Sequence, residues 1–253
     1  MPAWLEKLLK KFRLKSSKHG YTCDSCGAEL FEYPIHRLCN RCEGQLTRPY
    51  THVCEKCGRQ TYTQGVCLDC KSALPTFTRG FAPFVYQGNV AALVNRLKNG
   101  EPHLGWYFGE QMAEYFLAQS PNLKAESPLL IIPVPMTDRA QRKRGYNQAE
   151  RLAESIEERF TQRSVSAQLR ADILQKKKET ASQKKMSLQE RRKNVEGAYR
   201  VIERKACKDK TVLLIDDICT TGATASECAE RLLKAGANAV YFLAIAALPE
   251  SKA

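Results

Sequence analysis

Three apolar runs predict buried β-strands in the second half of the chain. They are LLIIPVP (129–135), TVLLI (211–215) and AVYFLAIAAL (239–248). Apolar residues recur at helical spacing in AALVNRL (91–97), GEQMAEYFLA (109–118), NQAERLAESIEERF (147–160) and ASECAERLLKAG (225–236), as in amphipathic helices. Strands that alternate with helices predict an α/β fold in which a parallel sheet is flanked by helices. In such sheets ligands bind beyond the carboxyl ends of the strands.

Cysteine usage divides the chain into two parts. Eight of its 11 cysteines lie between positions 23 and 70, as four C-x-x-C pairs: Cys23/Cys26, Cys39/Cys42, Cys54/Cys57 and Cys67/Cys70. Two such turns complete a closed tetrahedral shell of thiolates about 2.3 Å from one ion, and Gly27 and Gly58 follow two of the pairs, where a tight turn needs positive φ. The pattern predicts two structural zinc ions in a double zinc ribbon over residues 20–75, followed by a domain over 76–253.

Other uses of these cysteines fit the sequence less well. A cytosolic chain keeps its thiols reduced, and adjacent C-x-x-C pairs are a poor disulfide framework. Iron could occupy the same all-sulfur shell. His36 and His52 lie near the pairs but are not needed if eight thiolates serve two ions. Sequential grouping of the pairs is the simplest, and a crossed grouping is also compatible with the spacing.

The first 19 residues predict a basic amphipathic helix. Lysines lie between apolar residues at helical spacing, namely Trp4, Leu5, Leu8, Leu9 and Phe12. These charges interrupt the apolar core that a signal peptide would need, and no apolar run reaches the length of a membrane span. We therefore expect a soluble, cytoplasmic protein, and we assign no function to this helix.

Positive charge is concentrated in one segment of the chain. The formal net charge is +13, and residues 139–210 hold 21 Lys and Arg against 10 Asp and Glu. This excess suits either a solvated surface or the binding of polyanions, whether phosphates of a small ligand or of a nucleic acid. Tyr33, Tyr50 and Tyr62 lie among the cysteines and could stack on bases. We favour packing against the metal turns, because so small a domain has few other apolar residues.

The stretch VLLIDDICTTGAT (212–224) predicts a ligand site. Asp216 and Asp217 follow an apolar strand, and a helix is expected to open near Ala223. A phosphate there would meet unpaired N–H groups and threonine hydroxyls, and Gly222 lets the backbone approach closely. Because carboxylates repel a phosphate, the two acids must face hydroxyls or a bridging Mg²⁺. A ribose 5-phosphate meets these requirements, whereas dinucleotide and P-loop fingerprints are absent from the sequence.

This stretch resembles the phosphoribosyl pyrophosphate (PRPP) motif of type I phosphoribosyltransferases. The cysteine pairs, IIPVPMTDRAQRKRGYNQAERLA (131–153) and QERRKNVEGAY (189–199) extend the resemblance to the ComF family, named for competence for DNA uptake. The R-G-Y-N-Q-A stretch distinguishes that family from nucleobase salvage enzymes. The resemblance implies the type I phosphoribosyltransferase fold over 76–253 and an Mg²⁺-dependent PRPP-binding protein involved in natural transformation.

The resemblance also implies a role for individual residues. Asp216 and Asp217 would contact the ribose hydroxyls as catalytic residues. The 5′-phosphate would be held by Thr220, Thr221, Gly222, Ala223 and Thr224. The pyrophosphate would face the loop formed by Met136, Thr137, Asp138 and Arg139, with Arg142, Lys143 and Arg144 near enough to assist. The basic stretch 176–192 corresponds to a flexible loop that closes over the substrate.

The sequence leaves open whether the protein catalyses. In a phosphoribosyltransferase, a glycosyltransferase acting on PRPP, pyrophosphate leaves an oxocarbenium-like C1, and metal and basic side chains stabilise its charge. No acceptor-binding hood and no cysteine at position 2 can be identified, and Cys219 is interpreted as a packing residue. The alternative is a non-catalytic sensor of PRPP or a nucleotide, whose ribbons and basic segment dock single-stranded DNA or competence partner proteins.

Overall fold

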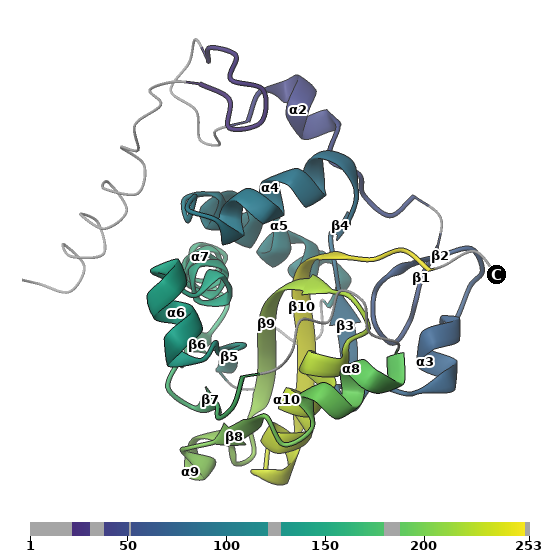
Figure 1. Cartoon of the computed structure of the whole chain (residues 1–253), viewed down its shortest axis with the longest axis vertical. Coiled ribbons are helices and arrows are strands. Elements are labelled where there is room, and N and C mark those ends of the chain that lie inside the picture. Colours follow the sequence, from purple (N-terminus) through teal and green to yellow (C-terminus); the bar gives the residue numbers. More distant parts are fainter. Residues whose placement is uncertain (1–21, 31–37, 51, 121–127, 180–187, 251–253) are drawn as a thin grey trace, which may run out of the picture.

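A parallel β-sheet forms the centre of the protein (Figure 1). The computed structural model describes residues 22–30, 38–50, 52–120, 128–179 and 188–250, so the helix expected over 1–19 lies outside them. Within this part of the chain the sheet has six strands, in the order β3-β10-β9-β5-β6 with β4 also paired to β10, and each pairing is parallel. The strands are β3 (Arg79–Phe81), β4 (Phe84–Val85), β5 (Leu129–Pro133), β6 (Ala167–Leu169), β9 (Thr211–Cys219) and β10 (Ala239–Ala247).

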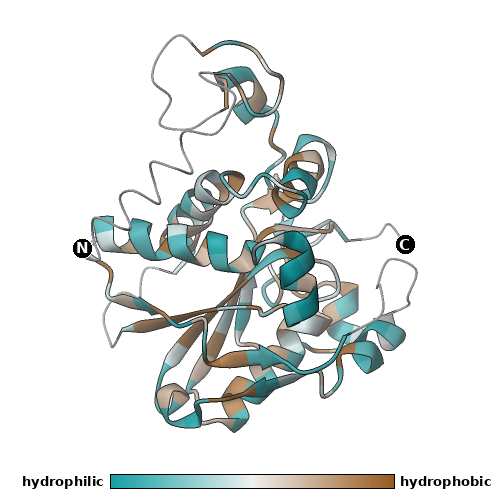
Figure 2. Cartoon of the chain, turned by 60° about the vertical axis from the view of Figure 1, so that its left-hand side comes forward, coloured by the Kyte–Doolittle hydropathy of each residue, from teal (hydrophilic) through white to brown (hydrophobic). Residues whose placement is uncertain are grey.

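Helices cover both faces of this sheet, which confirms the α/β prediction. One face packs against α4 (Gly88–Lys98), α5 (Leu104–Gln119) and α7 (Gln148–Gln162). The other packs against α10 (Ala223–Lys234), α8 (Leu188–Val195) and the antiparallel pair β7 (Leu174–Lys176) and β8 (Tyr199–Val201). The central strands bury apolar side chains on both faces, and Figure 2 shows brown, hydrophobic segments along the strands of the sheet. Strands buried on both faces explain the continuous apolar runs in the sequence.

Alternation along β9 assigns its side chains to two separate cores. Leu213 and Ile215 belong to the core under α4, α5 and α7, whereas Val212 and Leu214 belong to the core under α10. The three apolar runs of the sequence are β5, β9 and β10, which lie side by side in the sheet. The four expected helices are α4, α5, α7 and α10.

Two local predictions were wrong. We expected the strand over 211–215 to end before the acidic pair, but β9 continues to Cys219, because Asp216 pairs with Ala244 and Cys219 with Ala247 of β10. We expected a loop over residues 136–139, but α6 (Asp138–Arg144) begins there. Thr137 caps this helix by accepting a hydrogen bond from the Ala140 N–H at 3.3 Å.

The eight N-terminal cysteines form two groups at different places around the sheet (Figure 1). The first cysteine cluster, Cys23, Cys26, Cys39 and Cys42, lies beyond α4 and includes the short helix α2 (Asn40–Gly44). The second cysteine cluster, Cys54, Cys57, Cys67 and Cys70, lies beside β3 with the strands β1 (His52–Val53) and β2 (Gln60–Thr61) and the helix α3 (Leu68–Ser72). A short helix α9 (Arg204–Cys207) precedes β9. Among the described helices, none has the length and apolar character that crossing a membrane requires.

Candidate functional site

The acidic pair lies where the carboxyl ends of β5 and β9 meet. The Val134 N–H donates to the Ile215 carbonyl at 2.8 Å, which holds the two strand ends together. Because neighbouring residues of a strand point to opposite faces, Asp216 lies on the α10 face and Asp217 on the face of α4, α5 and α7. The structure thus brings both acids to the expected edge of the sheet but separates them across it.

Asp217 is buried and faces a lysine from another element. Its exposed fraction is 5%, and Lys98 Nζ at the end of α4 lies 3.2 Å from Asp217 Oδ2. Within the described part of the chain this buried oxygen has no hydrogen bond of good geometry, so Lys98 acts on it through charge. A buried carboxylate oxygen that accepts no hydrogen bond is suited to coordinate a hard cation such as Mg²⁺.

Asp216 holds its proton more tightly than an ordinary aspartate. Burial and the neighbouring charge of Asp217 raise the pKa of the Asp216 carboxyl from 3.8 to about 7, although the Asp217 N–H, Lys98 and Lys176 oppose the rise. The Asp217 N–H donates to Asp216 Oδ1 at 2.8 Å. Near neutral pH, Asp216 can therefore lose its proton when a metal ion or another cation binds the acidic pair.

Lys98 was missed in the sequence, where it appears as an ordinary lysine at the end of a helix. Tyr146 explains its placement, because the phenol donates to the Leu97 carbonyl and accepts from the Gly100 N–H at 3.1 Å. Asn147 follows and donates to the Val134 carbonyl at 3.1 Å. The R-G-Y-N-Q-A stretch therefore joins the end of α4 to the end of β5, beside the acidic pair.

The loop between β9 and α10 has the features of an anion site. Gly222 occupies the N-cap position with φ of 71° and offers no side chain to cap the helix. The first-turn N–H groups of a helix lack intrahelical partners, and the helix dipole favours a negative charge there. Thr221 Oγ1 lies 3.4 Å from the Ala223 N–H, and Arg59 Nη2 donates to the Thr220 carbonyl at 2.6 Å. Residues 220–224 are called the phosphate loop below.

Cys219 precedes this loop and is 1% exposed. Burial raises the pKa of its thiol to about 12. The thiol is therefore neutral and packed at physiological pH, in agreement with our interpretation that it is not a nucleophile.

A cavity lies beside β5 on the α10 face of the sheet. It has a volume of about 480 Å³. Its walls combine the start of α6 with the β7–β8 region, and the lining residues are Thr137, Asp138, Arg139, Gln175, Lys176, Lys177, Glu179 and Arg200. Three of the four residues expected to face pyrophosphate thus share a cavity with basic side chains of the stretch that begins at Lys176.

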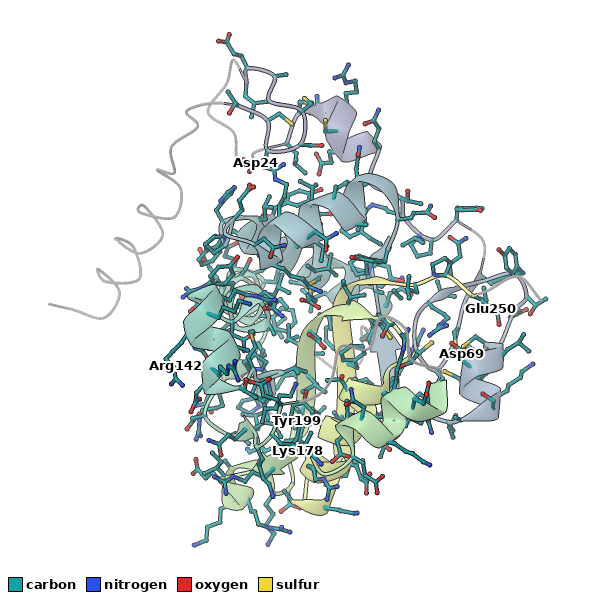
Figure 3. The ribbon with its side chains drawn as sticks, in the orientation of Figure 1. Asp24, Asp69, Arg142, Lys178, Tyr199 and Glu250 are labelled. Atoms are coloured by element: carbon teal, nitrogen blue, oxygen red, sulfur yellow. The ribbon has the colours of Figure 1, made fainter. Side chains whose placement is uncertain are left out.

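Lys176 connects this cavity to the acidic pair. It lines the cavity, and its charge acts on the carboxyl of Asp216. Burial lowers the pKa of Lys176, while Glu179 and Asp216 oppose this effect. Lys176 Nζ also lies 5.6 Å from the centre of the ring of Tyr199, which is labelled in Figure 3.

Other expected residues lie away from the cavity. Met136 is not among its lining residues, and Met136 Sδ lies 4.0 Å from Arg144 Nη1, which also donates to Gln148. Arg142 and Lys143 are exposed on α6, where Figure 3 shows Arg142 at the side of the molecule. Residues 180–187 of the expected closing loop lie outside the described residues.

Both cysteine clusters have the geometry of tetrahedral metal sites. In each, the four sulfur atoms lie within 4.8 Å of one another, which shows sequential grouping of the pairs. Sulfurs about 2.3 Å from one ion lie about 3.8 Å apart in a tetrahedron, and the distances from Cys26 to Cys39 and from Cys57 to Cys67 are both 3.8 Å. The eight cysteines form no disulfides. The clusters could therefore bind two structural zinc ions. His52 belongs to neither cluster, and His36 lies outside the described residues.

These features define an α/β protein with a polar site at the end of a parallel sheet and two tetracysteine clusters. No protein-family model matches the chain. It is 27% identical to Competence protein F of Haemophilus influenzae over 233 residues, which are 89% of this chain and 96% of that protein. It is 25% identical to Competence protein ComFC of Bacillus subtilis, over 80% of each chain. It is also 25% identical to DNA utilization protein YhgH of Escherichia coli K12, over 80% of this chain and 87% of that protein. The similarity to these relatives supports the identification of the chain as a ComF-family competence protein, in agreement with the sequence motifs.

Proposed function

We propose that this chain binds PRPP with Mg²⁺ at the carboxyl end of β9 and serves in the uptake or handling of transforming DNA. In this proposal the domain over 76–253 has the type I phosphoribosyltransferase fold and the segment over 20–75 is a double zinc ribbon. The observation that carries the proposal is the direct succession of the two acids, the phosphate loop and the helix N-terminus from β9 into α10. The names of the relatives support the connection to competence and DNA utilization.

The site offers a separate environment to each part of PRPP. The 5′-phosphate would accept hydrogen bonds from the phosphate loop and the first turn of α10. The ribose hydroxyls and Mg²⁺ would lie at Asp216 and Asp217, whose carboxylate oxygens suit both. The pyrophosphate would extend toward the cavity, where Lys176 and Arg200 supply positive charge. Mg²⁺ would offset a further part of the negative charge of the pyrophosphate group.

Calorimetric titration of PRPP, with and without Mg²⁺, tests this proposal. We expect Mg²⁺-dependent binding to the wild type, weaker binding to Asp216→Asn and to Asp217→Asn, and loss of binding in the double variant. Asp209→Asn is the matched control, because Asp209 is exposed near the opposite end of β9 and asparagine tolerates its φ of 58°. If PRPP does not bind a folded, zinc-loaded wild type, or binds the double variant equally well, the proposal fails.

The raised pKa of Asp216 adds a pH dependence to this titration. Since the folded carboxyl is protonated below about pH 7, Mg²⁺-dependent affinity should rise with pH up to that value and level off above it. Without ligand, the folded state binds one more proton than the unfolded state between the ordinary pKa of 3.8 and about 7. Stability should therefore fall as pH rises through this window, and Asp216→Asn should flatten both curves.

Release of pyrophosphate separates a transferase from a sensor. A transferase would release it from PRPP once a suitable nucleophile is supplied, and Asp216→Asn would abolish the release. A sensor would bind PRPP without turnover whichever acceptor is added. Both use the same site.

A second candidate function is the docking of single-stranded DNA. We expected Tyr50 and Tyr62 to pack against the metal turns, but their exposed fractions are 75% and 52%, and Tyr33 lies outside the described residues. Exposed aromatic rings are suited to base stacking, which contributes about 1–3 kcal/mol per base. The relative named DNA utilization protein supports this candidate.

Fluorescence anisotropy with a labelled oligonucleotide tests DNA docking. Affinity should fall steeply with salt, decrease in Tyr50→Ala and Tyr62→Ala, and persist in Asp216→Asn. The matched control is Tyr62→Phe, which keeps the aromatic face. Affinity that is independent of salt and of both tyrosines would contradict this function.

A further inference from the structure

Arg59 connects the second cysteine cluster to the phosphate loop. It is 4% exposed, and its guanidinium forms a bridge between two distant parts of the chain. Nη1 donates to Asp69 Oδ2 at 2.5 Å, and Nη2 donates to the Thr220 carbonyl at 2.6 Å. A buried guanidinium is costly to leave without partners, so this bridge holds Thr220 in one position.

The cysteines determine where both residues on the cluster side of this bridge lie. Arg59 follows Cys57 by two residues, and its own carbonyl accepts a hydrogen bond from the Cys54 N–H at 2.8 Å. Asp69 directly precedes Cys70 in α3. A metal ion that joins the four sulfurs would therefore fix Arg59 and Asp69 relative to each other.

Further contacts bring the same cluster against the loop. The four cysteines share a core with Phe77, Cys219 and Ala223. A Cβ atom at Gly222 would lie 3.6 Å from Cε1 of Phe77, so the ring lies directly against the loop. The Thr76 N–H donates to Ser226 Oγ at 2.9 Å, which ties the segment after α3 to the first turn of α10.

The backbone on both sides of Cys57 touches β3 at the edge of the sheet. The Gly80 N–H donates to the Lys56 carbonyl at 2.7 Å. At Gly58, where φ is +74°, an added Cβ would lie 2.6 Å from the Gly80 carbonyl oxygen. The turn that carries Arg59 is therefore pressed against β3.

We infer that Arg59 is a positioning residue for the phosphate loop, through which a metal ion in the second cysteine cluster maintains the loop in its ligand-binding shape. By fixing the Thr220 carbonyl, Arg59 restrains the peptide units that follow, whose N–H groups would meet an anion at the start of α10. The ligand side of this inference rests on the proposed function, whereas the effect on the loop does not.

The first cysteine cluster supplies a matched arginine for comparison. Arg96 donates from Nη1 to the carbonyl of Asp24, which follows Cys23, and its other nitrogens pair with Glu101. These contacts join the first cluster to α4 and leave the phosphate loop untouched. Arg96→Ala therefore removes a partly buried arginine beside a cysteine cluster without removing the contact to Thr220.

Hydrogen exchange of the amides at 220–226, in the zinc-loaded full chain, tests the inference without any ligand. We expect exchange in Arg59→Ala to be at least tenfold faster at these amides, whereas Arg96→Ala should stay within about twofold of the wild type. Methylguanidinium added to Arg59→Ala should slow exchange toward the wild-type rate, an effect that loss of packing alone would not produce. PRPP affinity, measured in parallel, should fall at least tenfold in Arg59→Ala.

Zinc content decides how a failed variant is interpreted. If Arg59→Ala loses zinc or unfolds, Arg59→Lys replaces it, because lysine keeps the charge but cannot bridge Asp69 and Thr220 in a fork. Wild-type exchange rates at 220–226 in a zinc-loaded, folded variant would overturn the inference. If the wild type does not bind PRPP, the proposed function fails, but the exchange measurement still decides the role of Arg59.

Discussion

The two cysteine clusters have the same local structure and different surroundings. In each, a glycine with φ of 74° follows the first C-x-x-C pair, and two of the sulfurs lie 3.8 Å apart. In the first cluster Cys26 is exposed and Cys39 half-buried, whereas all four cysteines of the second are at most 3% exposed. The C-x-x-C pattern thus determines the shape of the turn, whereas the packing around each cluster determines how much stability the loss of a metal ion would cost.

The contacts around the clusters account for this difference. The first cluster meets the helices through apolar packing of Cys23 and Cys42 and through polar side chains: Tyr107 donates to Glu43 Oε1 at 3.0 Å, and His103 Nε2 lies 3.2 Å from Asp24 Oδ2. In Figure 3 Asp24 marks this outlying segment, while Asp69 and Glu250 mark the second cluster beside the body of the protein. The Leu68 N–H donates to Glu250 Oε1 at 2.8 Å, so residues beyond β10 also hold the second cluster in place.

Removal of metal ligands should give the largest difference between the clusters. We expect Cys57→Ser/Cys70→Ser to lose one zinc equivalent and to lower the free energy of unfolding by more than about 4–5 kcal/mol, because all four cysteines of the second cluster are buried, whereas Cys26 of the first is exposed. Cys23→Ser/Cys42→Ser should also lose one zinc equivalent but lower it by about 1–2 kcal/mol. Denaturant unfolding with zinc analysis checks both, and equal losses of stability would contradict the contrast.

Alanine at the two turn glycines should give a smaller difference. Gly27 and Gly58 both have φ of 74°, but a Cβ at Gly27 would meet nothing within 4 Å, whereas one at Gly58 would lie 2.6 Å from a backbone oxygen. Gly27→Ala should therefore lower the free energy of unfolding by about 1–2 kcal/mol, the cost of a left-handed residue with a side chain. Gly58→Ala should cost about 1–3 kcal/mol more, because β3 must move. Similar values in denaturant unfolding would show that the turn tolerates this displacement.

Loss of one polar contact at the first cluster should give the smallest effect. Tyr107→Phe removes the hydrogen bond to Glu43 and should lower the free energy of unfolding by about 1 kcal/mol. Transfer of zinc from the first cluster to a chelator should become a few-fold faster, while transfer from the second cluster keeps its rate. A change at the second cluster instead would show that the two clusters are coupled through the sheet.

Much of the fold could be predicted from the sequence because its signals are local. The apolar runs of β5, β9 and β10, the amphipathic spacing of four helices and the C-x-x-C turns each depend on residues close together in the chain. The extension of β9 could not be predicted, since the partner strand decides whether Asp216 and Asp217 join the ladder. The exposed positions of Tyr50 and Tyr62 also depend on tertiary packing.

The candidate site shows the same limit. The acidic pair and the glycine-containing loop follow one another in the sequence and were found there. Lys98 reaches Asp217 from a helix more than 100 residues earlier, and Arg59 reaches Thr220 from 161 residues away. The sequence around Lys98 and around Arg59 carries no local signal for these contacts.

The sequence by itself determined the α/β pattern, the presence of eight cysteines in four C-x-x-C pairs and the order of acids, hydroxyls and glycine at the end of β9. Tertiary structure alone decided which side chains complete that site and which cysteine cluster is buried at all four of its cysteines. The physical reason is that turn geometry and apolar periodicity are properties of neighbouring residues, whereas burial and charge pairing depend on elements that meet only in the folded protein.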